Sequence, residues 1–180
     1  ISSRLGRSWG WDTLGVSVGA EGEFTDKLTG TVQLGYQQQT SQITGNGGGT
    51  PTVILELEQL LGRRTRLTLA YTRRNQVNID AVSVASVSDS FRLNLSRALG
   101  NRQKWFASIF ASLWQNDFPD IDRSDQALSL GTSLDYRIQE WMSSQLSYSY
   151  ADFSAQLPGW ALGGIDYQVN QVSLSLSFGF

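Results

Sequence analysis

The chain lacks cysteine and histidine altogether, and its 180 residues include a single methionine and three prolines. Without cysteine it has no disulfide framework, no thiol nucleophile and no thiolate zinc site. Without histidine it has no Ser-His-Asp triad, no imidazole base and no imidazole metal ligand. These absences lead us to expect a protein that is not an enzyme and that holds no cofactor and no metal ion.

Charge and long apolar runs are scarce as well. Only 17% of the residues are charged, and 14 basic residues against 16 acidic ones give a net charge of -2. A protein that binds nucleic acid electrostatically carries a basic excess, so we expect no nucleic-acid partner. No apolar run approaches the ~20 residues that a membrane helix needs. The chain also opens without a basic-then-apolar signal segment, so we expect it to be mature, processed or partial.

The dominant signal in the sequence is an alternation of apolar and polar residues with a period of two. From Val172 to Phe180, for example, Val, Leu and Phe alternate with Ser and Gly. Such a period indicates strands with one apolar face. The pattern predicts about nine strands, with these limits: Thr13–Phe24, Leu28–Thr40, Thr52–Leu61, Thr65–Gln76, Ser88–Leu99, Trp105–Gln115, Gln126–Ile138, Met142–Phe153 and Gln168–Phe180.

The predicted connections are alternately short and long, and aromatic residues cluster near both ends of the strands. Tilted strands of about 9–11 residues span a bilayer, and short turns, long external loops and two aromatic girdles are typical of outer-membrane barrels. The short-turn side has Phe24, Trp105, Tyr136, Trp141 and Phe180, and the long-loop side has Tyr36, Tyr71, Trp114, Tyr150, Phe153 and Trp160.

We therefore predict an all-β fold, an antiparallel up-and-down transmembrane β-barrel that forms a single domain over residues 1–180, in a bacterial outer membrane. A soluble β-sandwich or β-solenoid shows the same alternation, but its apolar face packs inward. Strand length, the asymmetry of the connections and the terminal phenylalanine favour the barrel.

The number of strands leaves three interpretations open. Nine strands would place Ile1 on the extracellular side, whereas single-chain bacterial barrels normally have an even number of strands and both ends in the periplasm. In the first interpretation, residues Ile1–Trp11 contain a short additional strand, which makes ten. Alternatively, one strand has been merged or split, or the chain is the C-terminal part of a larger barrel. We favour the last interpretation, because the chain begins without a start methionine or a signal segment.

The C-terminal stretch resembles the terminal signal of bacterial outer-membrane barrel proteins. In that class a terminal aromatic residue, preceded by apolar residues at alternate positions, is read by the barrel-assembly machinery. The resemblance implies that role for Val172, Leu174, Leu176, Phe178 and Phe180.

A second resemblance covers about the last 90 residues. The strings Ala127–Gly131, Leu134–Tyr136, Leu146–Tyr150 and Asn170–Leu174, with Trp141, are similar to those of outer-membrane barrel proteins encoded with exopolysaccharide export systems. This resemblance implies passage of a polysaccharide across the outer membrane and a periplasmic export partner.

The residues opposite the apolar stripe are the candidates for the lumen, because apolar and polar faces alternate in a membrane barrel. Opposite charges on adjacent strands lie close enough to pair, as expected for Glu56 and Glu58 with Arg66 and Arg74. The side chains predicted to face the lumen are Glu21, Glu23, Gln33, Gln37, Glu56, Glu58, Arg66, Arg74, Arg92, Asn94, Asp135 and Arg137.

These side chains permit two functions. They line a pore or export channel that selects a polysaccharide or another polar solute by charge and hydrogen bonding. Alternatively they form a salt-bridged plug in a narrow barrel, which then acts as a structural or interaction protein through its extracellular loops or as an anchor in a membrane complex. The surface partner expected in both cases is outer-membrane lipid.

Three smaller motifs have simpler explanations. Gln37–Gln39 could bind a sugar, but a solvated strand end beneath the aromatic girdle explains them. Asp117, Asp120, Asp122 and Asp125 offer oxygen ligands, but their spacing does not match a calcium-binding loop, so we expect a solvated acidic loop. Residues 45–49 are a flexible glycine-rich tip.

Overall fold

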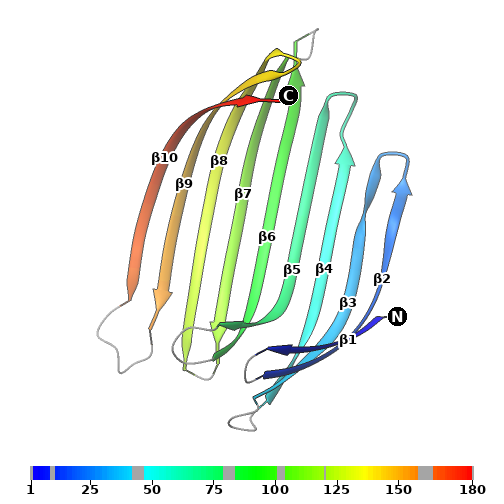
Figure 1. Ribbon diagram of the computed structural model, residues 1–180, viewed down its shortest axis with the longest axis vertical. Coiled ribbons are helices and arrows are strands. Elements are labelled where there is room, and N and C mark those ends of the chain that lie inside the picture. The colour runs from blue at the N-terminus through cyan, green and yellow to red at the C-terminus, as the bar shows by residue number, and fades with distance from the viewer. Residues whose placement is uncertain are drawn as a thin grey trace.

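The computed structural model of the chain is one antiparallel sheet of ten strands in sequence order (Figure 1). It describes residues 2–8, 11–41, 47–78, 84–100, 104–119, 121–157 and 164–179. The order confirms the predicted all-β, up-and-down architecture. The strands are β1 Ser2–Ser8, β2 Trp11–Thr25, β3 Leu28–Ser41, β4 Gly47–Leu60, β5 Thr65–Asn78, β6 Val84–Leu99, β7 Trp105–Phe118, β8 Arg123–Gln139, β9 Met142–Gln156 and β10 Ile165–Phe178.

The first strand, β1, decides whether the number of described strands is odd or even. β1 pairs antiparallel with the first half of β2, from Ser2 opposite Ser17 to Ser8 opposite Trp11. The interpretation that Ile1–Trp11 contains a short strand is therefore confirmed, and the described strands number ten.

The strands extend farther toward the long connections than the sequence predicts. β6 begins at Val84 instead of Ser88, and β7 ends at Phe118 instead of Gln115. β4 begins at Gly47, and its first three glycines pair with residues 38–40 of β3, so this part of the predicted flexible tip is strand. Residues 45 and 46 lie outside the described residues.

One face of the sheet is apolar and uncovered. The register places Leu113 opposite both Phe91 and Leu128, and such directly paired residues point to the same face. We call this the apolar face. Val172 and Leu174 on it are 72% and 74% exposed, and the only buried apolar residues in the described part of the chain are Phe118 and Ala155. A soluble sandwich would cover this face, so the prediction of a membrane barrel is supported against it.

The apolar face forms a band of limited height. On β7 it runs from Trp105 to Leu113 and gives way to Gln115 and Asp117 on the long-loop side. On β9 it ends at Tyr150, and the next side chain on that face is Asp152. The band has the height of the 9–11 residues with which a tilted strand crosses the hydrocarbon core.

Aromatic residues lie at both borders of this band. Near the short turns Trp105 stacks on Tyr136 with 4.3 Å between ring centroids, and Trp141 stacks on Phe178 at 6.3 Å. Near the long loops the hydroxyl of Tyr71 donates a hydrogen bond to Asp89. These contacts fit the two predicted girdles.

Two of the predicted girdle residues were assigned to the wrong face. Trp114 is paired with Ala127, and Ala127 with Phe153, on the face opposite Leu113. Neither Trp114 nor Phe153 therefore belongs to the girdle on the apolar face. Trp160 and Phe180 lie outside the described residues.

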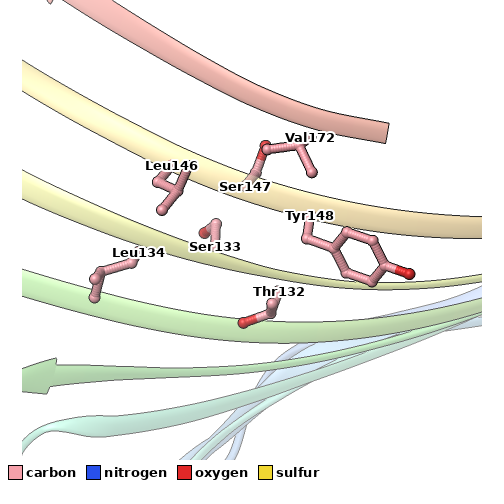
Figure 2. A pocket seen from close by; sticks show the side chains of 7 residues that line it. All are labelled: Thr132, Ser133, Leu134, Leu146, Ser147, Tyr148 and Val172. Carbon is pink, nitrogen blue, oxygen red and sulfur yellow. The ribbon is translucent and has the colours of Figure 1, made fainter. Parts of the chain in front are cut away.

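A shallow hollow interrupts the sheet surface at β8, β9 and β10 (Figure 2). Leu134, Leu146 and Val172 contribute apolar side chains from these three neighbouring strands, beside Tyr148. The register puts these residues on the apolar face. This part of the band is therefore a shallow depression in the apolar surface.

The sheet has two edges among the described strands, formed by β1 and β10 (Figure 1). β1 covers β2 only from Trp11 to Ser17. The described residues include no helix that is long and apolar enough to cross a bilayer.

Candidate functional site

The face opposite the apolar one carries the polar side chains, and we call it the polar face. The register connects it across the sheet, for example from Glu56 through Ala70 to Arg92. All twelve side chains predicted to face the lumen lie on it: Glu21, Glu23, Gln33, Gln37, Glu56, Glu58, Arg66, Arg74, Arg92, Asn94, Asp135 and Arg137. The alternation in the sequence therefore places every one of them on the same side of the sheet.

One of the predicted charge pairs forms. The Arg66 guanidinium lies 3.2 Å from the Glu58 carboxylate, with 56% and 38% of the two side chains exposed. Glu56 and Arg74 are not brought together, because Glu56 is opposite Ala70, four residues away from Arg74 along β5. An exposed pair contributes little to stability, about 0.2–1 kcal/mol, so Arg66 and Glu58 act mainly on the local potential.

The short-turn end of the polar face is hollow and rich in arginine. A cavity there is lined by Arg63, Arg64, Arg66, Ser96, Ala98 and Phe106, among others. Arg64 is held in place by a 3.0 Å hydrogen bond from its guanidinium to the carbonyl of Gly100. Several guanidinium groups around one open cavity make this end of the polar face attractive to anions and to polar oxygen atoms.

A row of aromatic residues on β7 points to the polar face. Phe106, Phe110, Trp114 and Phe118 follow each other at every fourth position, with Ser108, Ser112 and Asn116 between them. The Arg137 guanidinium lies 5.6 Å from the centroid of the Phe106 ring. The spacing of these aromatics was visible in the sequence, but the aliphatic Ile109 and Leu113 on the opposite face left the orientation of this strand ambiguous.

The long-loop end of the polar face is covered. Every buried residue in the described part of the chain lies here: Gln39, Thr50, Ser86, Ser88, Asn116, Phe118, Asp125 and Ala155. Figure 1 shows β1 and the start of β2 turning away from the direction of the other strands at this end. The polar face is thus hollow at one end and packed at the other.

The predicted acidic loop is split between the two faces. Asp125 is buried on the polar face and bound by the Arg123 guanidinium through two hydrogen bonds of 2.7 and 2.6 Å. Asp117 points the other way and accepts a 2.7 Å hydrogen bond from Ser124. Asp120 lies outside the described residues. Among the residues that are described, no three acidic groups come close enough to hold a metal ion.

The glutamine run is likewise divided by the strand. Gln37 and Gln39 lie on the polar face, and Gln38 lies on the apolar face opposite Leu14. Gln39 is 4% exposed, so it is not the solvated strand end that the sequence suggested.

The residues of the C-terminal signal line the apolar face of β10. Val172, Leu174, Leu176 and Phe178 point outward at alternate positions and are more than half exposed. Phe180 lies outside the described residues. The arrangement presents one continuous apolar edge to a bilayer.

The comparison with family models identifies the chain. Comparisons with curated proteins and with solved structures returned no match. The family model described as "Putative beta-barrel porin 2" matches residues 10–180, which is nearly the whole chain and includes β2 to β10. The uncovered apolar band, the aromatic borders and the polar opposite face agree with that match. The chain therefore belongs to this family of β-barrel porins and is a bacterial outer-membrane protein of pore-like function.

Proposed function

We propose that the chain builds the wall of an outer-membrane channel that passes a polysaccharide or another polar solute. The observation that carries this proposal is the continuity of the polar face. Charged and hydrogen-bonding side chains follow one another along it on β2 to β8, and the arginine-rich cavity lies at its short-turn end. In a barrel whose apolar band meets lipid, this face lines the lumen.

The mixture of positive and negative side chains on the polar face favours a polar solute that carries little net charge. Glu58 and Arg66 neutralise each other, and Ser108 and Ser133 share a 2.8 Å hydrogen bond on the same face. Such a surface replaces water around hydroxyl groups without holding an ion strongly. A polysaccharide, with many hydroxyl groups and long apolar ring faces, fits this chemistry.

A second function is favoured by the covered end of the polar face. Ser86 and Asn116 are only 1% and 5% exposed. A barrel in which the long-loop end of every strand were packed in this way would have its extracellular opening closed by side chains. The protein would then act as a structural or interaction barrel, through its extracellular loops or as an anchor in a membrane complex. In both cases we propose that it performs no catalysis and needs no cofactor.

The partners that we propose follow from the two surfaces. Outer-membrane lipid meets the apolar face, and the barrel-assembly machinery reads the C-terminal strand. A periplasmic export partner would meet the short turns, where Arg63 and Arg64 are exposed. Nucleic acid is no partner in this proposal.

Conductance of the full-length protein in planar lipid bilayers tests the channel against the filled barrel. A stable open conductance in KCl is expected for the channel. A protein that inserts and shows heat-modifiable mobility on a gel, but conducts no current, would show that the barrel is filled.

A further inference from the structure

The aromatic side chains on the polar face of β7 are not packed on all sides, as the side chains of a protein core are. Phe110 lies opposite Gly131 on β8, and a Cβ added to Gly131 would collide with the ring of Phe110. The ring of Phe110 therefore lies against the glycine, in space that a larger residue would fill. Phe110 is nevertheless 37% exposed, so part of it remains accessible on the polar side of the sheet.

The two neighbouring rings continue this surface toward both ends of the strand. Phe106 lines the arginine-rich cavity at the short turns. Trp114 is half-buried near the covered long-loop end. Residues four apart on a strand lie about 13 Å from each other on one face, so the three rings form a path rather than a cluster.

Polar groups accompany the path. Ser108 and Ser112 stand between the rings on the same face of β7. Beyond Trp114, the Oδ1 atom of Asn116 is buried and has no hydrogen-bond partner among the described residues. A buried acceptor without a partner costs free energy, and a bound hydroxyl group would remove that cost.

We propose that β7 carries a carbohydrate-binding path, in which Phe106, Phe110 and Trp114 stack on sugar rings and Asn116 accepts a hydrogen bond from a sugar hydroxyl. The proposal rests on the channel function proposed above and names its substrate class. One face of a pyranose ring presents C–H groups with a slight positive charge, and the face of an aromatic ring is negative, so the two attract. Aromatic rings and hydroxyl-binding groups therefore alternate along β7, as apolar ring faces and hydroxyl groups do along a sugar chain.

Entry to the path lies in the arginine-rich cavity. The guanidinium of Arg137, 5.6 Å from the centroid of the Phe106 ring, is a hydrogen-bond donor beside the first ring of the path. Guanidinium groups donate hydrogen bonds to hydroxyl and carboxylate oxygens alike. A sugar chain arriving from the short-turn side would meet donors and a ring at the same place.

The test is current block by a neutral linear oligosaccharide, maltohexaose, in single channels of the full-length protein. We expect block from the short-turn side, with a half-blocking concentration that rises roughly two- to tenfold in Phe110→Ala and in Trp114→Ala, as loss of one aromatic contact predicts. Leu113→Ala, on the apolar face of the same strand, is the matched control and should change nothing.

The outcomes separate the path from the channel. Open channels that maltohexaose does not block, or that it blocks in Phe110→Ala and Trp114→Ala at the same concentration as in the unsubstituted protein, would overturn the path and leave the channel standing. If the protein conducts no current, the channel function fails. Calorimetric titration of the detergent-solubilised protein with maltohexaose then decides the path: binding that Trp114→Ala weakens supports it, and no binding rejects it. If an alanine variant does not fold, Phe110→Leu or Trp114→Leu replaces it, because leucine keeps apolar volume but has no ring to stack on a sugar.

Discussion

Tyr71 on β5 donates a 2.6 Å hydrogen bond to the carboxylate of Asp89 on β6, across the border where the apolar face becomes polar. Arg73, the next residue on that face of β5, lies 3.5 Å from the same carboxylate. A phenol at this height has its ring in the apolar band and its hydroxyl among polar groups. The pair therefore marks the level at which the strands leave the hydrocarbon core.

Removing this hydrogen bond should destabilise the barrel. Tyr71→Phe leaves the ring in place and deprives the carboxylate of one donor, and a hydrogen bond to a charged group contributes about 1.5–3 kcal/mol. The measurement is urea unfolding of the protein in lipid vesicles. A double-mutant cycle with Asp89→Ala isolates the pair, and additive effects of the two substitutions would show that the hydrogen bond contributes nothing.

Arg66 should set ion selectivity rather than stability. Arg66→Gln frees the negative charge of Glu58 on the polar face, so the channel should shift toward cations while the free energy of unfolding changes by only about 0.2–1 kcal/mol. Reversal potentials in a KCl gradient measure the shift.

Arg73→Gln provides the control for selectivity, because Arg73 lies on the apolar side of the sheet beside Asp89. It should leave the reversal potential unchanged. Equal shifts in the two variants would mean that the polar face does not line the conducting path.

The sequence could predict the two faces but not the full length of the strands. Alternation within the bilayer is enforced by lipid on one side and polar contacts on the other, and it places residues such as Glu56 and Arg92 correctly. Above the band both sides of a strand can be polar, so Ser86 and Asp117 gave no sign of the strands that contain them.

The candidate path was harder to predict for a related reason. β7 carries Phe110 on one face and Ile109 on the other, so its apolar residues do not reveal which face meets lipid. The orientation comes from its neighbours, since Phe91 and Leu128 flank Leu113. The position of the Phe110 ring against Gly131 depends on the register between β7 and β8, which no local pattern in the sequence specifies.

A charge on the apolar face should be far more costly than the same charge on the polar face. Leu174→Arg places a guanidinium in the band on β10, where Leu174 is 74% exposed. It should cost about 2–4 kcal/mol, the range for arginine near the midplane of a bilayer. Ser175→Arg, the adjacent residue on the opposite face, is the matched control and should cost much less. Unfolding free energies in vesicles compare the two. Equal costs would mean that the apolar face does not meet lipid.

The free edges of β2 and β10 should be paired in the membrane. β1 reaches only Ser17, so residues 18–25 of β2 have no partner on that side within the described part of the chain, and β10 is bonded only to β9. An unpaired backbone group in hydrocarbon costs several kcal/mol, which makes an open edge untenable there.

Residue-resolved hydrogen exchange in bilayers tests whether these edges are paired, with the central strand β8 as the reference because both of its edges are paired. If the edge is closed, consecutive amides of Val172–Phe178 exchange as slowly as those of β8. Fast exchange at every second residue would show an edge open to water, and the strand could not then lie in the hydrocarbon core.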